Sequence, residues 1–204
     1  MSQKLWEKYP LLSTMSKLRA SRFNAAERLG RRYRWHSLSL VIFSIYVIAL
    51  SVAPQFFSEM SSSARNISAF VSVVSSVFVV ALSVYSAFSE DVVRGKYLHD
   101  NAKRVTNLYH QYKIEAIEHE SGARKELDTK RFERDYATIM DSCPYNHDSI
   151  DFRSAMAEIE GWKGSKKFWL GVRVVLDTYF WPALAIALPP LAIVVGLLVF
   201  PGAI

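Results

Sequence analysis

The chain has only one cysteine, Cys143, among its 204 residues. A single thiol excludes a disulfide framework within the chain and is typical of proteins kept in a reducing compartment. The sequence also lacks a G-x-S-x-G elbow, a phosphate-binding P-loop, a G-x-G-x-x-G turn and a C-x-x-C pair. It therefore predicts no catalytic centre and no cofactor, and we do not expect an enzyme.

Charge is absent from three long runs, His36–Ser58, Asn66–Ser89 and Thr178–Ile204, none of which contains Asp, Glu, Lys or Arg. A helix of about 20 apolar residues crosses the roughly 30 Å of a bilayer's hydrocarbon. Some 35 residues precede the first run, which is too many for the short leading region of a secretory signal peptide. Despite a net charge of +6, the segregation predicts an all-α membrane protein rather than a nucleic-acid-binding protein.

The second run is unusually rich in serine. At 100° per residue, one arc of its helix carries small hydroxylated side chains and one valine. The members of this arc are Ser68, Ser72, Ser75, Ser76, Val79, Ser83 and Ser86, and Glu90 follows on the same side just past the run. The arc either packs closely against a neighbouring helix or lines water in an oligomeric pore. In a pore, Val79 would be an apolar constriction, and a ring of Glu90 carboxylates would favour cations.

The first run carries serines of its own, with Ser44 and Ser51 seven residues apart on one face. Only the short polar loop 58–66 joins the two runs, so we expect an antiparallel transmembrane hairpin with helices at about 36–57 and 67–89. Ser44 and Ser51 are therefore either further pore-lining candidates or the other side of the same helix–helix seam.

Residues 1–35 predict a basic amphipathic region whose helix covers 13–35, with Ser13 as its N-cap. Residues 1–34 hold nine Lys and Arg, whereas the loop 58–66 holds one base, Arg65, which places the N-terminus in the cytoplasm. Basic side chains at this surface attract anionic headgroups. The candidates for this membrane-surface role are Arg28, Arg31, Arg32, Arg34, Lys166 and Lys167, of which the last two alternate with aromatic residues before the third run.

Residues 90–177 have 15 bases and 16 acids and predict a cytoplasmic helical region that runs on without a break from the second membrane helix. Apolar residues spaced by four and three mark one face of its first helix: Leu98, Ala102, Val105, Tyr109 and Tyr112. This face is either a coiled-coil seam between subunits or the buried face of a bundle helix. Further helices are expected at about 124–141 and 149–161.

His147 and Asp151 are four residues apart, a spacing found in metal ligands on helices. Neither a cysteine pair nor a second histidine lies near them, and Asp148 suits a helix N-cap. We therefore predict a cap and no metal site. The final block, 178–204, predicts a third spanning helix kinked at Pro189-Pro190 with its C-terminus outside the cell. The alternative is a re-entrant segment.

Three stretches resemble SLATT-domain proteins, over about residues 15–155. They are Arg22–Leu29 (RFNAAERL), Arg31–Val52 with Trp35-His36 at its start, and the polar turn Asn146–Phe152. The resemblance implies a two-transmembrane, non-enzymatic effector of bacterial nucleotide-signalling and anti-phage conflict systems. It implies a homo-oligomer that perforates the inner (cytoplasmic) membrane and stops growth of phage-infected cells, when a sensor protein or a nucleotide second messenger activates it. The alternative from the residues alone is a membrane-anchored adaptor whose cytoplasmic helices bind a partner protein.

Overall fold

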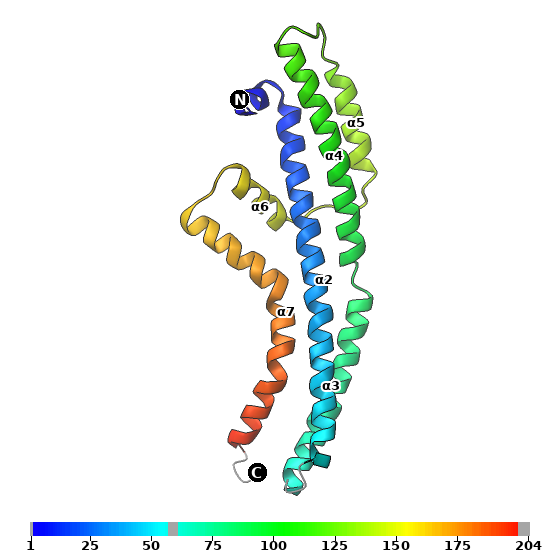
Figure 1. The fold of residues 1–204 in the computed structure, drawn as a ribbon, viewed down its shortest axis with the longest axis vertical. Helices are drawn as coiled ribbons and strands as arrows, with labels where there is room; N and C mark the ends of the chain where they lie inside the picture. Colours follow the sequence, from blue (N-terminus) through cyan, green and yellow to red (C-terminus); the bar gives the residue numbers. More distant parts are fainter. Residues whose placement is uncertain (1, 57–60, 200–204) are drawn as a thin grey trace. The chain divides into compact units, whose positions relative to one another are not determined.

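The computed structural model describes residues 2–56 and 61–199, and their secondary structure is entirely helical. The seven helices are α1 (Ser2–Lys8), α2 (Pro10–Phe56), α3 (Ser62–Ala87), α4 (Asp91–Glu120), α5 (Thr129–Asp141), α6 (Ser149–Ile159) and α7 (Gly164–Val199), as labelled in Figure 1. Side chains are described except at residues 2–4, 188–190 and 192–199. The prediction of an all-α protein is confirmed.

The chain divides into two units. Met1–Gly30 and Asp91–Val174 form what we call the bundle unit, and Arg31–Glu90 and Val175–Ile204 form the membrane unit. Three helical stretches are long and apolar enough to cross a membrane: Pro10–Phe56, Ser62–Glu120 and Gly164–Ala187. These stretches and their composition are those of a membrane protein.

The core of the bundle unit lies where α2, α4 and α5 pack together. Leu12 and Met15 of α2 meet Val105 and Tyr112 of α4, and all four side chains are at most 1% exposed. The Tyr112 ring stacks on Phe132 of α5 with 4.5 Å between the ring centroids. Burial of such large apolar side chains stabilises a fold by roughly 1.5–3 kcal/mol each.

The candidate coiled-coil face of α4 is buried in the chain's own core. Leu98, Ala102, Val105, Tyr109 and Tyr112 are each 4% exposed or less. They pack against the chain's own helices, chiefly α2 and α5. The bundle-helix interpretation describes these contacts, and in this conformation the five residues offer no face to a second subunit.

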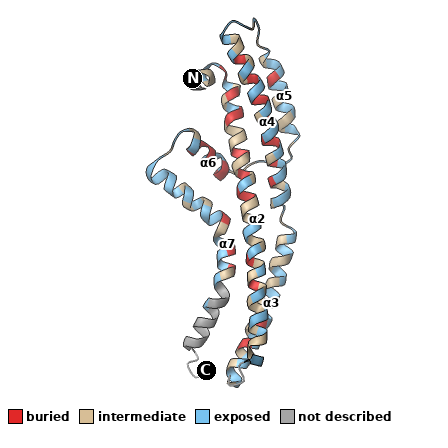
Figure 2. Ribbon diagram, viewed as in Figure 1, coloured by how far each residue is buried: buried red, intermediate tan, exposed pale blue. Residues whose placement is uncertain are grey.

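The membrane unit has the opposite distribution of apolar side chains. Ile45 and Ile48 of α2 and Phe70 and Val77 of α3 are between 59% and 69% exposed, and most of the surface of this unit is classed as exposed in Figure 2. Soluble proteins rarely expose apolar patches of this extent. Lipid is the solvent that suits such a surface.

Two helix boundaries differ from those expected from the sequence. α2 begins at Pro10, not at an N-cap at Ser13, because proline has a φ suited to the first helical turn and no N–H to leave unbonded there. The second membrane helix also does not run on into α4. The N–H of Phe88 bonds to Val84 O and that of Ser89 to Ser86 O, which closes α3, and α4 starts anew at Asp91.

The two helices at the end of the bundle unit start where a side chain can cap them. α5 begins at Thr129 rather than near 124, because the Asp128 carboxylate accepts the Arg131 N–H at 2.9 Å. α6 begins at Ser149, with Asp148 as N-cap in a capping box, so the predicted cap is confirmed. α7 includes Pro189 and Pro190 in one helix, and the kink expected there stays a prediction.

Candidate functional site

The serine arc of α3 forms part of the contact between α2 and α3. Ser68 donates to Leu50 O at 2.8 Å, and the hydroxyls of Ser51 and Ser72 lie 2.5 Å apart. Ser68 and Ser72 are each 8% exposed. Small side chains allow two helix backbones to approach closely and bond across the contact. For these three serines the packing interpretation describes what the structure shows.

The remaining candidates are not taken up by that contact. Ser76 is exposed, and its hydroxyl bonds back to Val73 O at 2.7 Å; Ser83 bonds to Val79 O at 2.8 Å. Ser44 bonds to Leu40 O at 2.8 Å. Ser44, Ser75, Val79, Ser83 and Ser86 are half-buried, and Glu90 is exposed. The arc is thus divided between a packed part and an open part, and pore lining stays a prediction for the open part.

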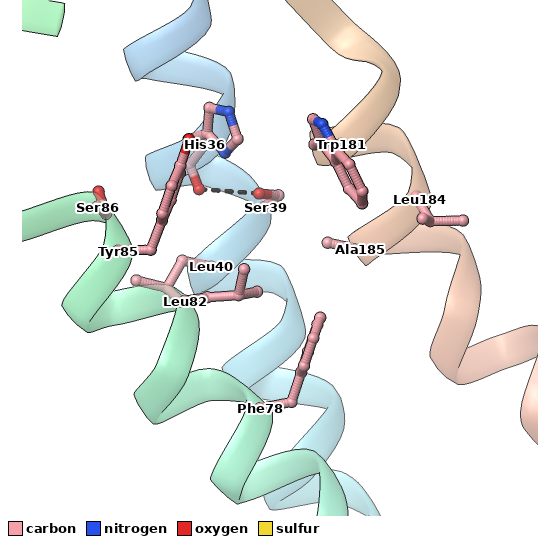
Figure 3. Close-up of a pocket in the computed structure, with 10 residues that line it drawn as sticks. All are labelled: His36, Ser39, Leu40, Phe78, Leu82, Tyr85, Ser86, Trp181, Leu184 and Ala185. Atoms are coloured by element: carbon pink, nitrogen blue, oxygen red, sulfur yellow. Dashed lines mark hydrogen bonds between the residues drawn. The ribbon is translucent and has the colours of Figure 1, made fainter. Parts of the chain in front are cut away.

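The membrane unit also contains a cavity that the sequence did not indicate. It has a volume of about 330 Å³ and lies between α2, α3 and α7 (Figure 3). Its lining is His36, Ser39, Leu40, Phe78, Leu82, Tyr85, Ser86, Trp181, Leu184 and Ala185. Polar groups gather at the end with His36 and Tyr85, Phe78 lies at the other end, and Leu40 and Leu82 lie between them (Figure 3). Of these residues, only Ser86 was a candidate from the sequence.

Aromatic side chains from all three helices surround the polar end of the cavity. The rings of Trp35 and Tyr179 meet edge to face with centroids 5.6 Å apart, and those of His36 and Tyr85 lie 6.3 Å apart. Trp and Tyr are enriched at the level of lipid headgroups. Such a cluster is typical of the level of a membrane–water interface. The clustering of aromatics around residues 35 and 179–181 was visible in the sequence, but their meeting was not.

A buried ionic cluster occupies the bundle unit and includes Arg28, one of the predicted membrane-surface bases. Arg28 is 3% exposed and binds Asp151 through two bonds, Nε to Oδ1 at 2.8 Å and Nη2 to Oδ2 at 3.0 Å. Its Nη2 also lies 2.5 Å from Asp148 Oδ2. Arg94 contacts the other oxygen of Asp148 at 2.8 Å. Arg28 is thus a core residue and not a membrane-surface base, because two carboxylates hold it inside.

The other predicted surface bases keep an accessible position. Arg34, Lys166 and Lys167 are exposed, and Arg31 and Arg32 are half-buried. Arg32 Nη1 lies 4.0 Å from Asp177 Oδ2. Their contact with lipid headgroups remains a prediction.

Polar groups next to the ionic cluster share its low-dielectric surroundings. Arg22 is 2% exposed and donates to Asn101, whose amide donates in turn to Ile139 O at 2.6 Å. Burial, followed by the nearby charge of Arg22, lowers the pKa of His147. Partial burial would raise the pKa of Asp148, but hydrogen bonds from Arg94 and Arg28 outweigh it and hold that pKa below its ordinary value. No group of three potential metal ligands occurs among the described residues.

The geometry brings together the motifs on which the resemblance to SLATT proteins depends, since Arg28 of the first motif binds Asp148 and Asp151 of the polar turn. The family model for the SMODS and SLOG-associating 2TM effector domain family 5 matches residues 7–200. The match extends well beyond the resembling range of about 15–155 and takes in most of the last hydrophobic run. No curated protein and no solved structure matches the chain. By a match over nearly its whole length, the chain belongs to the SMODS and SLOG-associating 2TM effector domain family 5.

Proposed function

We propose that several copies of this chain assemble into a pore in the bacterial inner membrane, and that its opening stops growth of phage-infected cells. Three spanning helices in one chain cannot enclose a water-filled lumen, so a pore requires a homo-oligomer. The chain contributes no catalytic step in this proposal. A sensor protein or a nucleotide second messenger would supply the activating signal, as is expected for an effector domain.

The observation that carries the proposal is the open part of the α3 serine arc. Ser76 is exposed and Ser83 is half-buried, and the two lie seven residues apart on one side of α3. A spacing of seven keeps them on nearly one line along the helix. Glu90, seven residues further on, is exposed in the turn between α3 and α4. The hairpin of a single chain leaves this line uncovered, so neighbouring copies can bring it to a shared lumen.

Topology follows from charge in this proposal. The bases of residues 1–34 and the mixed charges of 90–177 lie in the cytoplasm, and the loop 58–66 lies outside. Glu90 then stands at the cytoplasmic mouth of the pore. The C-terminus lies outside the cell if α7 crosses the membrane.

Cysteine accessibility tests whether Ser76 faces water. In a Cys143→Ser background, Ser76→Cys and the matched control Val77→Cys are each exposed to a membrane-impermeant thiol reagent in activated cells. Val77 is its sequence neighbour and is 65% exposed, but it points about 100° away around the helix. We expect Ser76→Cys alone to react. Equal reactivity of the two positions, or none at either, contradicts lumen lining.

Permeability tests the two ends of the proposed path. Glu90→Gln should lower the cation-to-anion permeability ratio of the pore in bilayers, because it removes a ring of carboxylates. Val79→Ser should raise the resting leak if Val79 closes the lumen by excluding water. An unchanged permeability ratio would show that Glu90 is not at the mouth.

The second candidate function is a membrane-anchored adaptor that does not conduct. The contact of Ser51, Ser68 and Ser72 across α2 and α3 favours it, because it shows that part of the serine arc serves packing. An adaptor predicts no ionic current in bilayers from the activated protein, and the same recordings therefore separate the two functions.

A further inference from the structure

We infer that the cavity between α2, α3 and α7 binds one acyl chain of an anionic phospholipid, with the headgroup phosphate at Arg32. This inference goes beyond the proposed pore and does not depend on it. It assigns a ligand to a cavity that the sequence did not indicate.

The medium around the membrane unit limits what can occupy the cavity. α2, α3 and α7 are the helices apolar enough to span a bilayer, so the molecules at their surface are lipids. At about 330 Å³ the cavity is at the small end of the range for ligand sites, which suits a single chain of a lipid.

The lining has a polar end and an apolar end, as a lipid molecule has. His36, Ser39, Tyr85 and Ser86 lie toward one end, and Phe78 lies at the other with leucines from α2 and α3 around it (Figure 3). The aromatic contacts Trp35–Tyr179 and His36–Tyr85 place the polar end at headgroup level. The apolar end then lies deeper in the hydrocarbon, where an acyl chain extends.

Charge selects the headgroup. Arg32 lies four residues before His36, so it is one turn nearer the water on the same face of α2. Its partner Asp177 lies one turn before Trp181 on α7, and the charged atoms are 4.0 Å apart, with 27% and 39% of the two side chains exposed. Both side chains are partly open to solvent, so the guanidinium is accessible to a ligand. A phosphate at this position gains a guanidinium that can bind it through two bonds.

Photolabelling tests the site in the full-length protein. The chain is reconstituted in phosphatidylcholine vesicles that contain phosphatidylglycerol with a photoactivatable group on its acyl chain, then washed in detergent, illuminated and mapped by mass spectrometry. We expect adducts at Leu82 and Leu184 and few at Ile45, which faces lipid with 59% exposure. No retained lipid after washing, or equal labelling at Ile45 and Leu82, overturns the inference.

Two variants make the test specific. Ala185→Phe fills the cavity and should abolish the adducts, whereas Ala187→Phe adds the same ring at an exposed position of α7 and should leave them unchanged. Arg32→Gln should lower the preference for phosphatidylglycerol over an equally labelled phosphatidylcholine by about fivefold, the factor that corresponds to about 1 kcal/mol for one arginine at a membrane surface. Equal retention of the two lipids by the unmodified protein overturns the anionic assignment. Mapping the unmodified protein decides the matter even if Ala185→Phe does not fold.

Discussion

Removing the carboxylate of Asp151 should destabilise the bundle unit severely. Arg28 and Asp151 are 3% and 2% exposed, and two hydrogen bonds of 2.8 and 3.0 Å join them. In Asp151→Ala the guanidinium loses its most buried partner, whereas its contact with Asp148 involves a side chain that is 45% exposed. Deleting one member of a buried ion pair costs about 3–5 kcal/mol, because the other charge stays desolvated.

Removing both charges together should cost much less. In Arg28→Met combined with Asp151→Leu, apolar side chains of similar volume replace the pair, and such replacements are often neutral. One loss remains, because the Asp151 carboxylate accepts the N–H of Asp148 at 3.1 Å in the capping box of α6. Losing that cap costs about 1 kcal/mol. We therefore expect the double variant to be about 2–4 kcal/mol more stable than Asp151→Ala alone.

Thermal unfolding in detergent micelles, followed by circular dichroism, measures these effects. For a chain of 150–250 residues, 1 kcal/mol shifts the Tm by about 2–4 °C, so Asp151→Ala should lower it by about 6–20 °C. Glu118→Ala is the control, since its bond to Arg124 is 3.3 Å long and both side chains are open to water, at 45% and 38% exposure. We expect at most about 1 kcal/mol from it. A Tm for Asp151→Ala no lower than the control's, or a double variant no more stable than Asp151→Ala, would refute the reasoning.

Three further outcomes are expected. Burial and Arg22 lower the pKa of His147 below 6.5; Arg94 also opposes its protonation, whereas Asp148 and Asp151 favour it. The unfolded state therefore binds more protons, and stability should fall as the pH drops below 6.5. His147→Gln should flatten that part of the Tm–pH curve, and an unchanged slope contradicts the assignment. Gly95→Ala should raise the Tm by about the equivalent of 0.5–1 kcal/mol, because alanine reduces the conformational freedom of the unfolded chain. The added Cβ fits, since it would meet Ala26 O at 3.5 Å and Leu29 Cβ at 3.6 Å, which are ordinary contacts. The larger side chain of Gly95→Leu should lower the Tm. Ser72→Val should weaken the hairpin by about 0.6 kcal/mol, because the hydrogen bond to Ser51 is lost. Ser76→Val should change the Tm less, because the Ser76 hydroxyl bonds to its own helix at Val73 O. Equal losses would show that the bond between α2 and α3 adds no stability.

Much of the fold could be predicted because the signals are local. Runs without charge mark the membrane helices, as the 24 residues from Asn66 to Ser89 show, most of which lie in α3. Asp148 was identifiable as a cap from its place before an apolar run, and Gly122, with φ +77°, ends the turn after α4. Boundaries were less certain where two signals compete. At Phe88–Glu90 no proline interrupts the pattern, yet tight turn bonds end α3 before α4 begins.

The candidate site was predictable in part, and one residue shows why. Arg28 sits in a run of bases beside a membrane helix, which is the usual place for a headgroup-binding arginine. Its partner Asp151 is 123 residues away along the chain, and no local pattern connects the two. The same holds for the cavity, whose lining comes from three helices that are distant in sequence.

By itself, the sequence determined which segments are helical and apolar, where charge lies along the chain, and that one side of α3 carries small hydroxyls. These properties follow from the local composition and from the spacing of apolar and polar residues within segments of fewer than about 30 residues. Only the tertiary structure decided how each face is used: that the apolar face of α4 is buried within its own chain, that Ser51 meets Ser72 while Ser76 stays open, and that Arg28 lies in a core. The physical reason is that burial and ion pairing depend on which distant segments meet, and a helical face has the same period whether its neighbour is lipid, water or another helix of the chain.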